Sequence, residues 1–127
     1  MRLDKRVTDD QALASELRPR GPVALAIAEQ HDDGRLRLVL DGELDVLTVL
    51  QFSRRVDEIV RRESGDLEVD LCKLRFIDSA GLHVLLNAQR RLTRRGRRLT
   101  VLGRSGPVTR AFALARLSDT LGLVLAD

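Results

Sequence analysis

The sequence predicts an α/β domain, a mixed sheet of about four to five strands with helices packed against it. Two observations support this prediction. Segments in which apolar and polar residues alternate, as in strands, are followed by segments whose apolar residues recur at helical spacing. Only a short turn separates the first two strand-like segments, whereas helix-like segments separate the later ones. We therefore expect an initial β-hairpin and then parallel strands joined by helical crossovers.

Two short strands and a tight turn form the predicted hairpin. Residues 23–29 and 36–40 each place alternate apolar side chains on one face. The turn between them, residues 31–34, ends in Asp-Gly, which is a strong hairpin signal because Gly tolerates positive φ. Residues 41–47 are then expected to connect the second strand to a helix.

The first predicted helix follows this connection. Asp45, with Thr48 three residues later, is typical of a helix N-terminus, because a short side-chain oxygen can accept from a free backbone N–H. Apolar residues then recur at helical spacing among charged ones and predict one buried face, made of Val49, Phe52, Val56, Ile59 and Val60.

A third strand leads directly into a second helix. Residues 67–71 alternate apolar and acidic side chains, and Phe76 and Ile77 are expected to extend the apolar side toward the core. Asp78 and Ser79 then break the strand pattern, and both are good N-cap residues.

The helix that starts near Ser79 has two unlike faces. Its apolar arc consists of Leu82, Val84, Leu85, Leu86, Ala88 and Leu92. The polar stripe headed by Ser79 continues through His83, Asn87, Arg90 and Arg94. A phosphate on Ser79 would meet free backbone N–H groups and the positive end of the helix dipole. From these residues alone, a plain N-cap is the simpler interpretation of Ser79.

The remaining residues continue the alternation. We expect a strand at Leu99–Leu102, a helix opened by Pro107, and a last short strand at Leu121–Leu125.

The composition, 43% hydrophobic, is that of a globular chain. We expect one domain at residues 22–127, preceded by a polar leader, residues 1–21, that is mobile or loosely docked. The longest apolar run, residues 23–28, is much shorter than the roughly 20 residues that span a bilayer. The N-terminus also lacks the hydrophobic core of a signal peptide, so a cytoplasmic location is expected.

Arginine provides most of the positive charge, and the formal net charge is +3. A basic cluster is formed by Arg90, Arg91, Arg94, Arg95, Arg97 and Arg98. Such a cluster either binds a polyanion such as nucleic acid or is a solvated helix end, where cations favour the negative end of the dipole. The second interpretation is favoured, because Tyr and Trp are absent and all three Phe are expected in the core, which leaves no platform for stacking bases.

Several kinds of chemistry are not expected. No glycine-rich nucleotide-binding motif is present, and His31, His83 and Cys72 are too few for a zinc site. Cys72, the only cysteine, cannot form an internal disulfide. Ser79 is not in a Gly-x-Ser-x-Gly elbow, and no third group orients His83 as a base. We therefore expect no cofactor, no metal and no enzyme activity.

The segment FIDSAGLHVLL, residues 76–86, resembles the signature of STAS domains, in particular the bacterial anti-sigma factor antagonists. Two other segments agree in order and separation. LDGELD, residues 40–45, resembles the Gly-Glu-Leu-Asp strand end of the family, and SGPV, residues 105–108, resembles the start of its last helix. The resemblance covers about Val23 to the C-terminus and implies the STAS fold. It fails at Arg116, where the family commonly has a Gly that ends this helix.

The resemblance also implies roles for single residues. In the family, the Ser of the Asp-Ser-x-Gly-Leu turn is phosphorylated, and it corresponds to Ser79. Asp78 would help to present that serine to the kinase, and the family fold would bring Asp45 close to it. His83 is either an exposed helix residue or a partner contact. The implied partner-binding set is Asp45, Asp78, Ser79, His83, Asn87 and Arg90.

The resemblance implies partner switching that regulates sigma-factor-dependent transcription. The unphosphorylated chain would bind an anti-sigma factor with a histidine-kinase-like ATPase fold, and phosphorylation of Ser79 by that partner would end the binding. A metal-dependent serine phosphatase would reset the chain. Two alternatives stay open: a constitutive STAS scaffold or transporter-associated subunit without switching, and a nucleic-acid binder that uses the Arg90–Arg98 cluster.

Overall fold

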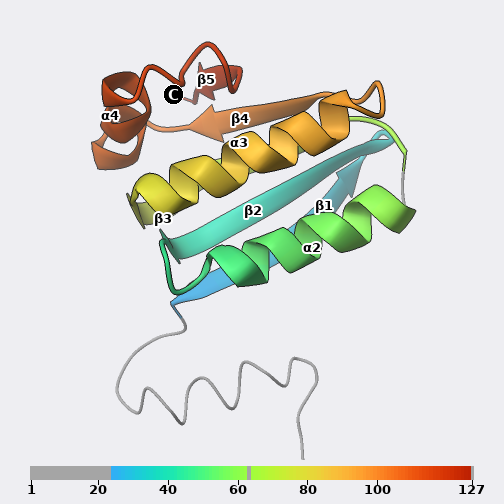
Figure 1. Cartoon of the computed structure of the whole chain (residues 1–127), viewed down its shortest axis with the longest axis horizontal. Helices are drawn as coiled ribbons and strands as arrows, with labels where there is room; N and C mark the ends of the chain where they lie inside the picture. Colours follow the sequence, from blue (N-terminus) through green and yellow to red (C-terminus); the bar gives the residue numbers. More distant parts are fainter. Residues whose placement is uncertain (1–23, 63, 127) are drawn as a thin grey trace, which may run out of the picture.

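The computed structural model describes residues 24–62 and 64–126, which form a five-stranded sheet and three helices (Figure 1). In chain order the elements are β1 (Leu25–Asp32), β2 (Arg35–Leu44), α2 (Val49–Arg62), β3 (Leu67–Ile77), α3 (Ser79–Thr93), β4 (Leu99–Gly103), α4 (Pro107–Leu114) and β5 (Leu123–Leu125). The predicted leader, residues 1–21, lies outside the described residues.

The sheet has the strand order β1-β2-β3-β4-β5. β1 and β2 are antiparallel, and every later pair of neighbours is parallel. Asp33 and Gly34 form the hairpin turn with φ values of 51° and 77°, and Asp32 pairs with Arg35 on either side of it. Two residues with positive φ give the turn a twist that matches the strands. The predicted mixed sheet with an initial hairpin is confirmed.

β2 extends further than the sequence predicted, because it continues through residues 41–44. Gly42 has a φ of 123°, and a Cβ there would lie 2.2 Å from the carbonyl oxygen of Ala24. The Glu43 N–H donates to that same oxygen at 2.8 Å. Glycine thus allows β2 to continue through the register shift between Gly42 and Glu43, and Leu44 beyond it is completely buried. The expected connection to the first helix is therefore only residues 45–48.

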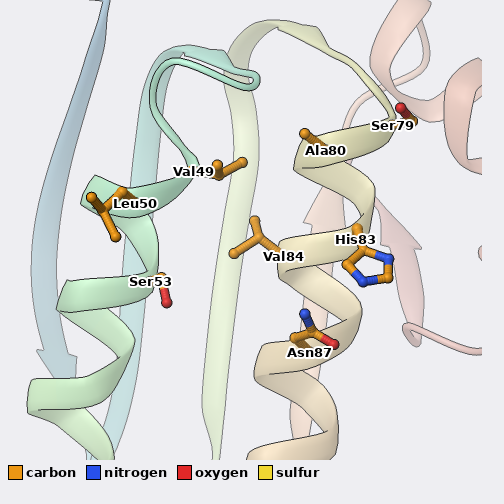
Figure 2. Close-up of a pocket in the computed structure, with 8 residues that line it drawn as sticks. All are labelled: Val49, Leu50, Ser53, Ser79, Ala80, His83, Val84 and Asn87. Carbon is orange, nitrogen blue, oxygen red and sulfur yellow. The ribbon is translucent and has the colours of Figure 1, made fainter.

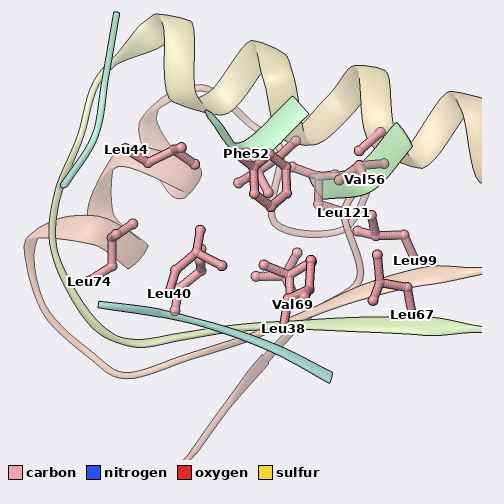
Figure 3. Packing of buried hydrophobic residues seen from close by; sticks show 14 of the residues in the cluster. Leu38, Leu40, Leu44, Phe52, Val56, Leu67, Val69, Leu74, Leu99 and Leu121 are labelled. Atoms are coloured by element: carbon pink, nitrogen blue, oxygen red, sulfur yellow. The ribbon is translucent and has the colours of Figure 1, made fainter. Parts of the chain in front are cut away.

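The core lies between the sheet and the two helices α2 and α3, which run side by side across one face of it (Figure 1). Phe52 and Val56 of α2 are fully buried above Leu38 and Val69 of the sheet (Figure 3). Leu85 of α3 is also fully buried, so the predicted apolar faces of both helices are confirmed.

Phe76 is not part of this core, contrary to the expectation from the sequence. Its residue surface is 48% exposed, whereas Leu74 and Ile77 on either side are buried. Gly42 pairs with Leu74 but Glu43 pairs with Phe76, so β3 has one extra residue at Arg75. This bulge shifts the alternation and turns Phe76 outward.

α4 ends in a left-handed turn at Arg116, which has a φ of 60°. The Arg116 N–H donates to the Ala113 carbonyl, and the Leu117 N–H donates to the Phe112 carbonyl at 2.9 Å. This pair of bonds is the common helix-ending motif in which glycine is preferred. Arg116 makes the turn despite its Cβ, and the last strand, β5, begins at Leu123 rather than at Leu121.

Candidate functional site

Ser79 is the first residue of α3, and Asp78 is the residue that caps the helix. Asp78 has extended backbone angles, and its Oδ1 accepts a hydrogen bond of 2.9 Å from the Gly81 N–H. The Ser79 hydroxyl is exposed and makes no hydrogen bond to another described residue. A capping serine directs its hydroxyl at the helix backbone, whereas this one remains accessible.

The loop after β2 lies against the first turn of α3. Asp78 Oδ2 accepts from the Val46 N–H at 3.3 Å, and the Asp78 N–H donates to the Leu44 carbonyl at 3.3 Å. A Cβ on Gly81 would lie 2.3 Å from the Leu44 carbonyl oxygen, closer than real Cβ atoms come. The glycine of the Asp-Ser-x-Gly turn is therefore what allows helix and loop to meet.

Asp45 is in the same loop, directly before Val46. Its Oδ1 accepts from the Leu47 N–H at 3.0 Å, and its own N–H donates to Thr48 Oγ1 at 3.0 Å. Thr48 is buried and donates to the Glu43 carbonyl at 2.8 Å. Asp45 thus shapes the loop, one residue away from the contact between loop and helix.

A groove of about 610 Å³ separates the first halves of α2 and α3. Val49 and Val84 point toward each other across it, and Ser79, His83 and Asn87 lie along the exposed side of α3 (Figure 2). The groove is lined by Val49, Leu50, Ser53, Ser79, Ala80, His83, Val84 and Asn87. The fold therefore brings three of the predicted site residues to one groove.

Three exposed apolar side chains at or near this groove were not predicted from the sequence. Val46, Leu47 and Leu50 are 69%, 77% and 58% exposed. The signal was available for Leu50, because it falls outside the helical repeat of Phe52 and Val56 and yet is apolar. An exposed apolar patch next to a polar stripe is typical of a protein-binding surface.

The basic cluster divides into two kinds of arginine. Arg91 Nη1 lies 2.5 Å from Asp57 Oδ1 of α2, and Arg97 Nε donates to the Gly65 carbonyl at 2.6 Å. Arg91 therefore ties α3 to α2, and Arg97 ties the chain after α3 to the end of α2 and the segment that follows it. Arg90 and Arg94 are exposed and have no ion pair within residues 24–62 and 64–126.

Other site chemistry is sparse in the part of the chain that the structure describes. No group of three or more His, Cys, Asp or Glu in it could hold a metal ion. None of its helices is both long and apolar enough to cross a membrane. Burial, and then Asp70, raise the pKa of the half-buried Cys72 thiol, which disfavours the reactive thiolate.

Comparison with known proteins identifies the family. The sequence model described as "Mlab, STAS domain" matches residues 27–125. The chain belongs to the STAS domain family. An anti-sigma F factor antagonist from Paenibacillus polymyxa is 32% identical over 94 residues, which are 73% of this chain and 80% of the relative. The resemblance stated from the sequence is thus confirmed.

Solved structures show the same STAS fold. The crystal structure of an anti-sigma factor antagonist from Mycobacterium paratuberculosis has a TM-score of 0.73 at 23% identity, with 81% of this chain and 87% of that chain covered. The anti-sigma factor antagonist SpoIIAA in its unphosphorylated form has a TM-score of 0.69 at 22% identity, covering 80% of this chain and 89% of its own. The predicted STAS fold is confirmed.

Proposed function

We propose that this STAS domain is an anti-sigma factor antagonist whose binding is switched by phosphorylation of Ser79. In its unphosphorylated form it binds an anti-sigma factor with a histidine-kinase-like ATPase fold, and so frees the sigma factor for transcription. That partner phosphorylates Ser79, and a metal-dependent serine phosphatase removes the phosphate. The chain is then a substrate of the kinase and not itself an enzyme.

The accessible hydroxyl of Ser79 is the observation that carries this proposal. Because Asp78 caps α3, the Ser79 hydroxyl makes no hydrogen bond to another described residue. It lies at the helix start, on the groove that Leu50 also lines. Val46 and Leu47, in the loop bonded to Asp78, are exposed as well. A kinase can reach such a hydroxyl without unfolding the helix. The relatives named anti-sigma factor antagonists support the same role.

A phosphate on Ser79 would act on binding rather than on folding. It adds about −1.5 to −2 charges at neutral pH. The helix N-terminus stabilises a nearby anion by about 0.3–1 kcal/mol, so the domain should stay folded. A partner surface that had accepted a neutral hydroxyl would instead have to desolvate this charge, which is costly without a counter-ion.

The remaining predicted residues take positioning and contact roles in this proposal. Asp78 and Asp45 hold the loop and the serine in place through their backbone hydrogen bonds. His83, Asn87 and Arg90 are exposed along the same side of α3, where a partner that covers Ser79 would touch them.

The test is a phosphorylation and binding assay with purified proteins. The chain is mixed with candidate anti-sigma factors of its source cell and ATP, and the phosphate is located by mass spectrometry. We expect phosphate on Ser79, strong binding by Ser79→Ala in the presence of ATP, and much weaker binding by Ser79→Asp. Ser105→Ala is the matched control, since Ser105 is also an exposed serine but does not line the groove.

Other outcomes would favour the alternatives. If wild type and Ser79→Asp bind the partner with equal affinity, and no phosphate is found on Ser79, the chain would be a constitutive scaffold or a transporter-associated subunit. Binding to nucleic acid with sequence preference at physiological salt would instead favour a role for the arginines, because nonspecific attraction is weak and falls steeply with salt.

A further inference from the structure

We propose that the seam between α2 and α3 is a docking groove for one amphipathic helix of the partner, with acidic side chains at the end that reaches Arg90 and Arg94. The opposite end of that helix presents apolar side chains to Val49, Leu50 and Val84. This inference rests on the proposed function, because the partner meant is the anti-sigma factor that binds at Ser79.

The groove beside Ser79 does not end at Asn87. A second hollow of about 330 Å³ continues it along the same two helices and shares Ser53, Val84 and Asn87 with the first. Together they extend from Ser79 to Arg94. At 1.5 Å per residue, this stretch of α3 is about 22 Å long, which matches about four turns of a helix. Two adjacent helices leave a furrow into which the side chains of a third can pack.

The two ends of the seam differ in polarity. At the Ser79 end, Val49 and Val84 form the walls, and Leu50 lies on the rim with 58% of its surface exposed. At the other end, Arg90 and Arg94 line the second hollow. A helix that fits both ends must therefore be apolar in one half and charged in the other.

The charge of that half must be negative. Neither hollow is lined by an acidic residue, and Arg90 and Arg94 have no ion pair within the described residues. Arg91 lines the second hollow as well, but Asp57 already neutralises it at 2.5 Å. Carboxylates on the partner would provide the missing counter-charges, and such complementarity fixes the register of docking.

The acidic half is also excluded from the Ser79 end. The carboxylates of Asp45 and Asp78 lie around the start of α3 and would repel it. A phosphate on Ser79 would add more negative charge at the end where the partner is apolar. The partner helix is therefore expected to bind with its acidic half at Arg90 and Arg94. Phosphorylation of Ser79 would weaken binding in that orientation.

The seam fits a protein better than a nucleic acid. The rings that line the two hollows are Phe52, which is fully buried and cannot stack on a base, and the single exposed imidazole of His83. No Lys or Arg lines the first hollow, so it would attract a phosphate backbone only weakly. Two arginines that have no ion pair among the described residues, at one end of a largely apolar furrow, match acidic side chains on a folded partner.

The test uses the anti-sigma factor whose binding Ser79→Asp abolishes. The double variant Arg90→Glu/Arg94→Glu of the full chain should bind it at least about tenfold more weakly than wild type. The loss should shrink at high salt, because exposed charges are screened. Arg95→Glu/Arg98→Glu is the matched control: it makes the same charge change at exposed arginines that line neither hollow. Its affinity should stay close to that of wild type.

A second pair of variants tests the apolar end. Leu50→Asn should weaken binding, whereas Leu114→Asn should not, because Leu114 is 86% exposed but lies on α4. Unchanged thermal midpoints will show that all four variants are folded.

The outcomes separate the two proposals. If wild type binds no anti-sigma factor, the proposed function fails and this inference fails with it. If wild type binds and Ser79→Asp does not, but charge reversal at Arg90 and Arg94 has the same small effect as the control, only the docking groove is wrong. If these reversals abolish binding to a fluorescent DNA duplex and leave the anti-sigma factor bound, the arginines belong to a nucleic-acid site instead.

Discussion

The two long faces of α3 differ in what they contact. One face is buried against the sheet and α2. It consists of Gly81, Leu82, Leu85, Ala88 and Leu92, and none of its leucine or alanine residues is more than 9% exposed. The other face carries Ser79, His83, Asn87 and Arg90, which are all exposed. Stability therefore depends on the first face, and the second can bind, or accept a phosphate, without being needed for the fold.

Residues at the first turn of α3 contribute both to packing and to the candidate binding surface. Gly81 lets α3 approach Leu44, and Asp78 bonds both to the helix and to the loop at Val46. Substitutions of Asp78 or Gly81 should therefore affect both stability and binding, whereas those of Ser79 and of residues further along α3 should affect only one. The following predictions test that division through the free energy of unfolding.

The largest loss is expected for Leu85→Ala on the buried face. Leu85 is 0% exposed, so its truncation should lower the free energy of unfolding by about 2–5 kcal/mol. Leu86→Ala should cost less, because Leu86 is only half-buried. Urea denaturation measures both, and a midpoint that Leu85→Ala leaves in place would show that the assigned helix phase is wrong.

Gly81→Ala should cost about 1–3 kcal/mol, as overpacking does. The new Cβ would be 2.3 Å from the Leu44 carbonyl oxygen and 2.7 Å from Ile77 Cγ1, so helix and loop must separate. Denaturation and partner affinity should both change in this variant. Asn87→Ala, on the exposed face, is the comparison and should leave stability almost unaltered. Wild-type stability in Gly81→Ala would contradict the close approach.

Asp78→Ala should cost about 1 kcal/mol, as the loss of a helix cap does. Asp78→Asn should cost less, because its amide oxygen can still accept from the Gly81 N–H. Thermal unfolding distinguishes the two variants. If they are equally destabilised, the carboxylate charge or the second hydrogen bond, from the Val46 N–H, matters more than the cap hydrogen bond at 2.9 Å.

Ser79→Asp should have the smallest effect on folding. Ser79 makes no hydrogen bond to another described residue, and a negative charge at a helix start is favourable by about 0.3–1 kcal/mol. The thermal midpoint should stay the same or rise slightly, while partner binding falls. A loss of stability as large as that of Asp78→Ala would show that the serine also supports the fold, which would break the division between the faces.

Much of the fold followed from local patterns in the sequence. The Asp-Gly turn and the apolar faces of α2 and α3 depend on neighbours in the chain, so alternation and helical spacing revealed them. Phe76 was misplaced because the bulge at Arg75 arises from pairing with β2, which no local pattern records. The extension of β2 was missed for the same reason, since it depends on the contact of Gly42 with Ala24.

Only the α3 wall of the candidate site was predicted from the sequence. The Asp-Ser-x-Gly turn pointed to Ser79, and the helical repeat placed His83, Asn87 and Arg90 on an exposed stripe. The opposite wall of the groove, formed by Val49, Leu50 and Ser53, depends on how α2 packs beside α3. The division of the arginines also depends on that packing, because Asp57 of α2 pairs with Arg91.

Each strand of the sheet pairs with the strand that precedes it in the chain, and this order has a consequence for synthesis. Only the β1–β2 pair joins segments that are close in the chain, because a helix separates the two strands of every parallel pair. As the chain leaves the ribosome, the β1–β2 hairpin can form first, and each later helix and strand adds to the free edge. Every residue that lines the groove lies at or before Arg94. We therefore expect the nascent chain to form it before β4 and β5 have been made.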